Sequence, residues 1–173
     1  DWGHGSTLSL FAGSAVADGH AAGLAGAAIG WELTPRWSIE GAGEWQEWGR
    51  DPDGFGASLT THYGLWRTRN MMPTVLGGVG LFRASFDEPD STLPEFYRSR
   101  LAAQHRMGRG ATFTDPSLVA GFGLAAFVNR HWSIQPDARA VVFTRHDHAY
   151  PRTTFTVRVV YHFEDHPVTP SRQ

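Results

Sequence analysis

The sequence contains no cysteine and no lysine, and neither charge is in clear excess. Without cysteine, the chain has no disulfide framework, no thiolate metal site and no cysteine nucleophile. All 15 basic residues are arginine, and together with 17 acidic residues they give a formal net charge of −2. A nucleic-acid-binding domain normally carries a strong basic excess, so the composition argues against a nucleic-acid partner.

Long apolar runs are also absent. No stretch reaches the roughly 18 uncharged apolar residues of a transmembrane helix, and the mean hydropathy of −0.31 is typical of a soluble protein. Helix signals are weak because many of the 20 glycines interrupt the apolar segments. A membrane β-barrel is compatible with these values, since its strands alternate apolar and polar residues. The 173 residues fit one domain, and the start at Asp1 favours a removed signal peptide.

What the sequence does contain is alternation with a period of two. Near the C-terminus, apolar side chains occupy every second position, and most residues between them are polar. The apolar set is Phe155, Val157, Val159, Tyr161 and Phe163. This pattern predicts a β-strand with one apolar face and one polar face.

The same pattern predicts eight strands, each with at least the roughly 9–11 residues that a tilted membrane strand needs. They lie near residues 6–17, 21–34, 37–49, 56–68, 73–86, 117–129, 132–145 and 153–164. The predicted connections are short at 34–36, 69–72 and 129–131 and longer at 50–55, 87–116 and 146–152. Asp18-Gly19 is a short exception. Short turns on one side and long loops on the other are typical of an outer-membrane barrel.

Two of the short connections resemble each other. The segment from Thr34 to Glu40 (TPRWSIE) is similar to the segment from Asn129 to Gln135 (NRHWSIQ). We interpret this similarity as two hairpin turns under the same constraints and not as an internal duplication.

With these segments, the chain resembles a known group of proteins. The likeness rests on LTPRWSIEGAGEW, MMPTVLGGVGLFRASF, NRHWSIQPDARAVVF and TTFTVRVVYHF, and it covers about residues 6–164. Their order and spacing are similar to those of the small eight-stranded outer-membrane β-barrels, the group that includes OmpA-type transmembrane domains. One feature departs from the group, whose barrels usually end on an aromatic residue. Here Phe163 is followed by the polar tail EDHPVTPSRQ.

The resemblance implies an all-β, eight-stranded antiparallel up-and-down transmembrane β-barrel over residues 1–164, with a polar tail at 165–173. It also implies an integral protein of the bacterial outer membrane, with periplasmic termini and long extracellular loops. The group includes anchors, adhesins, small channels and a few lipid-modifying enzymes. We expect a non-enzymatic membrane anchor or interaction protein without a cofactor. Its expected partners are outer-membrane lipid and lipopolysaccharide, and a protein or surface assembly is a further candidate.

In such a barrel, a set of polar side chains should face the interior. These residues share strand faces and carry both charges: Glu40, Glu44, His62, Asp137, Arg139, Arg158 and His162. An eight-stranded barrel is just wide enough for its side chains to fill it. Paired charges would then close the lumen, because unpaired charges are costly to bury. A narrow gated conduit is the alternative.

Aromatic residues near the strand ends predict a membrane interface. Trp37 and Trp132 begin strands beside short turns, whereas Tyr161 and Phe163 end the last strand. Amphipathic rings favour the depth of the lipid headgroups, so these residues should form an aromatic girdle at one interface. A soluble core that contains the tryptophans is the alternative.

The longest predicted connection, 87–116, is acidic in its first half and basic in its second. A short helix is expected between about Glu95 and Met107. The basic half would contact lipopolysaccharide phosphates through bidentate hydrogen bonds or dock a partner protein, and its arginines are Arg98, Arg100, Arg106 and Arg109. A solvated loop folded over the barrel mouth is equally compatible with the sequence.

Two further patterns suggest chemistry. His146-Asp147-His148, with His20 and His105, contains residues that bind zinc or copper, but the spacing is not a specific signature and we expect no metal site. A lipid A deacylase family of eight-stranded barrels uses a His-x-Ser arrangement with a Glu, and His131-x-Ser133 has this spacing. The pair lies at a short turn, however, and no Glu occurs in the strand that follows. A lipid A-modifying hydrolase is therefore one alternative function.

A soluble lipocalin-like barrel that binds a small apolar ligand is the other alternative. It predicts a lumen lined by apolar side chains, whereas the inward set predicted above is charged. It also leaves the outward tryptophans, leucines and phenylalanines unexplained.

Overall fold

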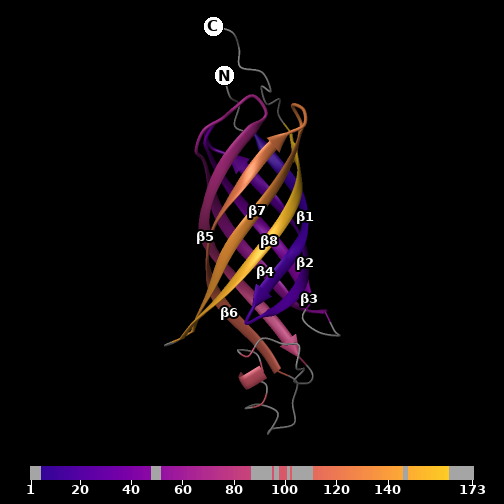
Figure 1. Ribbon diagram of the computed structural model, residues 1–173, viewed down its shortest axis with the longest axis vertical. Helices are drawn as coiled ribbons and strands as arrows, with labels where there is room; N and C mark the ends of the chain where they lie inside the picture. The colour runs from indigo at the N-terminus through magenta and orange to yellow at the C-terminus, as the bar shows by residue number, and fades with distance from the viewer. Residues whose placement is uncertain are drawn as a thin grey trace.

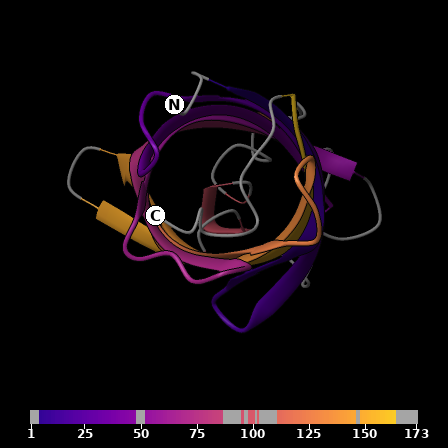
Figure 2. The same ribbon diagram turned by 90° about the horizontal axis from the view of Figure 1, so that it is seen from above.

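A computed structural model shows a single β-sheet closed into a barrel (Figure 1). The structure describes residues 5–47, 52–86, 95, 98–100, 102, 111–145 and 148–163. Its strands are β1 (Ser6–Ala17), β2 (His20–Glu32), β3 (Trp37–Glu47), β4 (Pro52–Gly64), β5 (Met71–Phe86), β6 (Ala111–Phe127), β7 (Trp132–Arg145) and β8 (His148–His162). Seen along the barrel axis, the strands form a ring (Figure 2). Among the described residues, no helix has the length and apolar character that a membrane crossing requires.

Each strand pairs antiparallel with its neighbours in sequence, and β1 closes the barrel by pairing with β8. The predicted eight-stranded, all-β, up-and-down fold is therefore confirmed. The two ends of the barrel differ in their connections. The short-turn end holds the turns 33–36, 65–70 and 128–131, and the long-segment end is the opposite one, where residues 87–110 join β5 to β6. The strands span residues 6–162, and the predicted tail at 165–173 lies outside the described residues.

Proline accounts for the largest errors in the predicted strand boundaries. β6 begins at Ala111 and not at 117, and β8 begins at His148 and not at 153. Within these strands, Pro116 lies opposite Leu81 and Pro151 lies opposite Val142. A proline removes one ladder hydrogen bond, but the pairs on either side persist, so the strand continues through it.

The predicted loops are correspondingly shorter. Because β5 and β6 pair as far as Phe86 and Ala111, the connection predicted at 87–116 reduces to 87–110. The longer loops predicted at 50–55 and 146–152 are mostly strand, since β4 begins at Pro52 and β8 at His148. β4 also ends at Gly64, before the predicted end at 68.

Side chains alternate between the inside and the outside of the barrel along every strand. In β8, Arg158 and Thr156 are buried, whereas Phe155 and Val157 are more than half exposed. On β6, Leu118, Ala120 and Phe122 are exposed, and Phe122 reaches 66%. The interior is more apolar than we expected from the charged residues alone. It also holds Phe11, Leu24, Leu76, Phe82, Phe113, Val119, Val141 and Phe143.

The turns are built by short polar side chains and glycine. Thr34 Oγ1 accepts the backbone N–H of Trp37 at 2.9 Å, and Asn129 Oδ1 accepts that of Trp132 at 3.0 Å. The two turns thus use the same hydrogen bond, which explains why their sequences are similar without an internal duplication. At the opposite end, Asp18 and Gly19 both have positive φ, of 50° and 77°, which is the requirement of a two-residue hairpin turn.

The turn geometry predicts the effect of replacing Gly19. Gly19→Ala should lower the free energy of unfolding by about 1 kcal/mol, because an L side chain is strained at this φ. Gly23→Ala is the matched control, since Gly23 is exposed in a strand and no atom lies within 4 Å of a Cβ placed there. Equilibrium urea unfolding followed by tryptophan fluorescence measures both. Equal destabilisation by the two substitutions would contradict the turn assignment.

Candidate functional site

The middle of the lumen is occupied by ionised side chains from β3, β7 and β8. Arg158 Nη1 donates to Glu40 Oε2 at 2.6 Å, and Arg158 Nε donates to Asp137 Oδ2 at 2.8 Å. Arg139 Nε donates to Asp137 Oδ1 at 2.9 Å, and Arg139 Nη2 lies 3.6 Å from Glu40 Oε1. We call Glu40, Asp137, Arg139 and Arg158 the central cluster. The structure thus brings together residues that the sequence only assigned to the same side of their strands.

The central cluster is electrically balanced, with a carboxylate for each guanidinium. Arg158 is only 1% exposed, and Glu40 is also buried. At a buried position, removal of one partner from an ion pair leaves the other charge unpaired, which typically lowers the free energy of unfolding by about 3–5 kcal/mol. Glu40 and Arg158 are 118 positions apart in the sequence, so their ion pair connects β3 to β8 across the lumen.

An aromatic ring completes the surroundings of Arg158. The ring centroid of Phe11 lies 4.8 Å from Arg158 Cζ, within the range of a cation–π contact. Phe11 can lie across the lumen because Gly26 on β2 has no side chain. A Cβ at this position would overlap the Phe11 ring. Gly26 therefore contributes to the site by leaving space.

His62 extends the cluster on the β4 side. Its Nε2 lies 3.7 Å from Glu40 Oε1 and 3.1 Å from Thr60 Oγ1. His62 is thus inside the barrel, in contact with the carboxylate that also binds Arg158. In the described part of the chain, no group of three or more metal-ligating side chains is arranged to hold an ion.

Glu44 belongs to a second cluster, closer to the long-segment end. Arg152 Nη2 donates to Glu44 Oε1 at 3.2 Å, and Arg152 Nη1 donates to Gln46 Oε1 at 2.6 Å. The guanidinium lies 4.8 Å from the ring centroids of both Phe82 and Phe143. We call Glu44, Gln46 and Arg152 the Arg152 cluster.

Arg152 and Gln46 are not among the residues that the sequence predicts to face the interior. The signal was present, because Arg152 is in phase with Arg158 and Gln46 is in phase with Glu40 along their strands. A strand boundary after Pro151 places Arg152 in a loop, where alternation predicts no inward side. The side-chain partners also depend on the register between strands, which the sequence pattern does not supply.

The arginines predicted for loop recognition have different positions. Arg100 turns toward the barrel, where its Nη1 donates to Asp115 Oδ2 at 2.8 Å and its Cζ lies 3.8 Å from the Phe113 ring. Arg98 pairs with Glu95 at 2.6 Å on the short helical segment that was expected there. Arg106 and Arg109 lie outside the described residues, as do His105, His146 and Asp147.

At the short-turn end, Ser133 bonds to a different histidine from the one proposed. Its Oγ lies 2.9 Å from His162 Nε2, and His162 Nδ1 lies 3.4 Å from Glu32 Oε1. His131 Nδ1 lies instead 3.2 Å from the backbone carbonyl oxygen of His162. The order of Ser133, His162 and Glu32 resembles a charge relay. However, Ser133 has no exposed surface, so a substrate carbonyl has no access to its Oγ.

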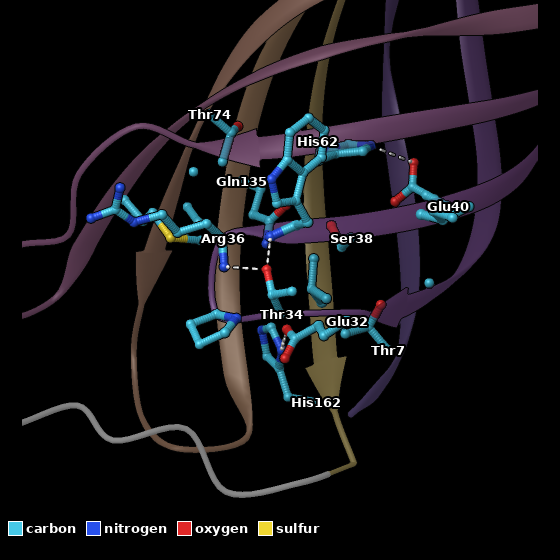
Figure 3. Close-up of a pocket in the computed structure, with 18 of the residues that line it drawn as sticks. Thr7, Glu32, Thr34, Arg36, Ser38, Glu40, His62, Thr74, Gln135 and His162 are labelled. Atoms are coloured by element: carbon cyan, nitrogen blue, oxygen red, sulfur yellow. Dashed lines mark hydrogen bonds and ion pairs between the residues drawn. The ribbon is translucent and has the colours of Figure 1, made fainter. Parts of the chain in front are cut away.

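A small cavity lies between these groups and the turn at Arg36 (Figure 3). Its volume is about 70 Å³, and Glu32, Glu40, His62 and His162 contribute to its wall. This volume admits a few water molecules, whereas pockets for small organic ligands have at least about 300 Å³. These four side chains come from β2, β3, β4 and β8, and Thr7, Thr74 and Gln135 add polar groups from β1, β5 and β7.

Arg67 also lines this cavity, from the turn between β4 and β5. Its guanidinium carbon lies 4.6 Å from the ring centroid of Phe127. Burial lowers the pKa of Arg67 below its ordinary value, and the negative charge of Glu32 opposes that change. The side chain of Arg67 thus lies over the short-turn end of the barrel.

The residues predicted as an aromatic girdle all lie at the short-turn end. Trp37, Trp132 and Phe163 are exposed on the outer surface, and Tyr161 is half-buried between its neighbours. The ring centroid of Tyr161 lies 4.9 Å from that of Trp132 and 5.1 Å from that of Phe163. Trp37 packs on Tyr63 at 4.8 Å.

Comparisons with known proteins give matches at the level of structure. No protein-family model and no curated protein matches the sequence. The N-terminal β-barrel domain of Pseudomonas aeruginosa OprF matches with a TM-score of 0.62 and 16% identity, over 91% of this chain and 97% of that one. Neisserial surface protein A matches with a TM-score of 0.65 and 11% identity, over 92% and 97% of the two chains.

The attachment invasion locus protein Ail of Yersinia pestis matches with a TM-score of 0.57 and 16% identity, over 94% of this chain and all of that one. The chain has the fold of the small eight-stranded outer-membrane β-barrels. The resemblance found in the strand motifs is therefore confirmed for the fold. A structure of Ail with the heparin analogue sucrose octasulfate also matches, with a TM-score of 0.52 and 12% identity.

The balance of charge in the central cluster predicts the effect of removing Glu40. Glu40→Gln should lower the free energy of unfolding by about 3 kcal/mol, because Arg139 and Arg158 then share the single carboxylate of Asp137. The control is Glu47→Gln on the exposed end of the same strand, where the change should stay within about 0.5 kcal/mol. Urea unfolding measures both, and a loss below 1 kcal/mol for Glu40→Gln would argue against the cluster.

The burial of Ser133 predicts a structural effect of its removal. Ser133→Ala should lower the free energy of unfolding by about 1 kcal/mol, since the buried imidazole of His162 loses a hydrogen-bond partner. Lipid A incubated with the wild-type barrel and with the variant should give identical mass spectra. Deacylation by the wild-type protein that disappears in a folded Ser133→Ala variant would establish a hydrolase instead.

Proposed function

We propose that this chain is an integral protein of the bacterial outer membrane that acts as a non-enzymatic anchor or interaction protein. One observation carries the proposal: apolar side chains cover the outside of the barrel, while charged side chains pair with one another inside. So many large apolar side chains on the outer surface are unusual in a soluble protein, and they suit a barrel surrounded by hydrocarbon. The fold shared with OprF, Neisserial surface protein A and Ail supports the proposal.

The length of the apolar surface agrees with a membrane. On β5, outward residues are apolar or glycine from Met71 to Leu81, a separation of ten positions. At about 3.3 Å per residue and a tilt of about 40°, this separation corresponds to about 25 Å along the barrel axis. An apolar band of about 25 Å is typical of outer-membrane barrels. The exposed aromatic residues Trp37, Trp132 and Phe163 would lie at one edge of this band.

The orientation follows from segment 87–110, because each of the other connections between strands has six residues or fewer. Outer-membrane barrels have short periplasmic turns and longer extracellular segments. The short-turn end would therefore face the periplasm, and segment 87–110 would face the outside. An interaction with a surface partner would then involve that end of the barrel. Ail, which shares the fold, has been crystallised with a heparin analogue.

The lumen would be closed and not conducting. The central cluster and the Arg152 cluster lie one above the other along the inward face of β3, at Glu40 and at Glu44 and Gln46. Phe11, Phe82 and Phe143 fill the space beside the guanidiniums. The cavity of about 70 Å³ at the short-turn end is bounded by Glu40. Passage of an ion would require these pairs to separate, which is costly in a medium of low dielectric constant.

Two measurements test this function. The folded protein should migrate differently on a gel before and after boiling and should need detergent or lipid to stay in solution. Reconstituted in a planar bilayer, it should show no sustained conductance, because both charged clusters obstruct the lumen. Monomeric behaviour in buffer without detergent would exclude the membrane assignment. Stable single-channel currents would exclude the closed lumen and leave the membrane assignment intact.

A further inference from the structure

Arg83 differs from the arginines of the lumen because it points out of the barrel. It lies on β5 in phase with the outward residues Val79 and Leu81, which are more than half exposed, and it is itself exposed. Leu81 is the last apolar residue of the outward series, and β5 runs from there toward the long-segment end. The guanidinium of Arg83 therefore lies next to the end of the apolar outer surface of β5.

The depth of Arg83 follows from the length of that surface. It lies two positions beyond Leu81, which adds about 5 Å along the barrel axis to the band of about 25 Å. Its long side chain reaches further in the same direction. If the apolar band spans the hydrocarbon, the guanidinium lies at the depth of the lipid headgroups, where phosphate groups are found.

The neighbours of Arg83 provide both hydroxyl groups and an apolar surface. Thr114 lies opposite it on β6 and Phe55 opposite it on β4. One step farther along the strands, Ser85 and Thr112 are paired, with their hydroxyl oxygens 3.2 Å apart. All of these side chains except that of Phe55 are polar, and all are exposed.

Arg83 has a charge that the described residues do not neutralise. Within the part of the chain that the structure describes, its side chain takes part in no ion pair and no hydrogen bond. Arg100, Arg139, Arg152 and Arg158 each have a carboxylate partner. An arginine presents a planar fork of donors that matches the oxygens of a phosphate. Since the described residues supply no counter-charge for Arg83, we expect a bound anionic group to supply it.

We propose that Arg83 binds the phosphate of an anionic lipid in the leaflet around the long-segment end, an inference that rests on the membrane location proposed above. In the outer leaflet, this lipid is a phosphorylated lipid A. Thr114, Ser85 and Thr112 supply hydroxyl donors beside the phosphate, and Leu81 and Phe55 contact the acyl chains below it. A free phosphate ion would gain nothing from the two apolar side chains, which favours the lipid.

The experiment compares Arg83→Gln with Arg69→Gln in nanodiscs that contain lipid A in a background of neutral phospholipid. Arg69 is the matched control, because it is also exposed, lies in the turn at the opposite end of the same strand and has no partner among the described residues. After extraction into detergent, native mass spectrometry measures the lipid A that each barrel retains. A parallel set uses lipid A from which both phosphates have been removed.

We expect Arg83→Gln to retain about fivefold less phosphorylated lipid A than the wild type, in line with the effect of one basic residue at an anionic surface. Arg69→Gln should retain as much as the wild type, and dephosphorylated lipid A should bind all three proteins equally. Equal retention by the wild type and Arg83→Gln, or equal losses in both variants, overturns the proposal. Release of the lipid by millimolar inorganic phosphate also overturns it, because the site would then be one for a free anion.

The gel-shift assay keeps this test separate from the proposed function. Both variants should show the same heat-dependent migration as the wild type, since neither side chain is packed inside the barrel. A wild-type barrel that inserts but retains no phosphorylated lipid A overturns the Arg83 site alone. A wild-type barrel that does not insert overturns the membrane location and the Arg83 site with it.

Discussion

The guanidinium of Arg158 lies in the middle of the barrel, where side chains surround it and bulk water does not. It is held by Glu40 on β3 and Asp137 on β7, while Arg158 itself belongs to β8. A charge in this position is stable only when opposite charges compensate it, because the lumen of an eight-stranded barrel is filled by its own side chains. The ion pairs therefore do more than fill space. They require that β3 meets β7 and β8, which lie far from it in the sequence, in one register.

The same arrangement recurs along the lumen. Arg158, Arg152 and Arg100 each combine a carboxylate partner with a phenylalanine ring against the guanidinium. Arginine suits this role because its planar group can donate to two acceptors at its edge and stack on a ring with its face. Lysine, which is absent from the chain, carries a compact and strongly hydrated charge that cannot do both. The repeated contact of a guanidinium with a carboxylate and a phenylalanine ring thus explains how charges and aromatic rings fit together in so narrow an interior.

The sequence predicts the fold better than it predicts the site. Alternation with a period of two identifies the strands and shows that Glu40, Asp137 and Arg158 share the inward side, because side chains of a strand point alternately to its two faces. It does not identify partners, since the pairing of Arg158 with Glu40 depends on the relative shift of strands that do not adjoin each other. The error at β8 comes from a proline: Pro151 favours a loop, and a loop assignment hides the inward phase of Arg152. The hydrogen bond from Ser133 to His162, and not to His131, is also a product of pairing between β7 and β8.

Alternation links the interior of the barrel to its outer surface, since a shift of one residue in any strand would exchange the two. The inward residues pack against one another and compensate one another's charges. Few of their polar groups are therefore free to bind another molecule. In the functions proposed here, recognition consequently belongs to the ends of the barrel and to its outer face. Arg83 is the clearest consequence of that division. It lies on a strand whose inward residues include Leu76 and Phe82, yet its own phase places it outside, where none of the described residues pairs with its charge.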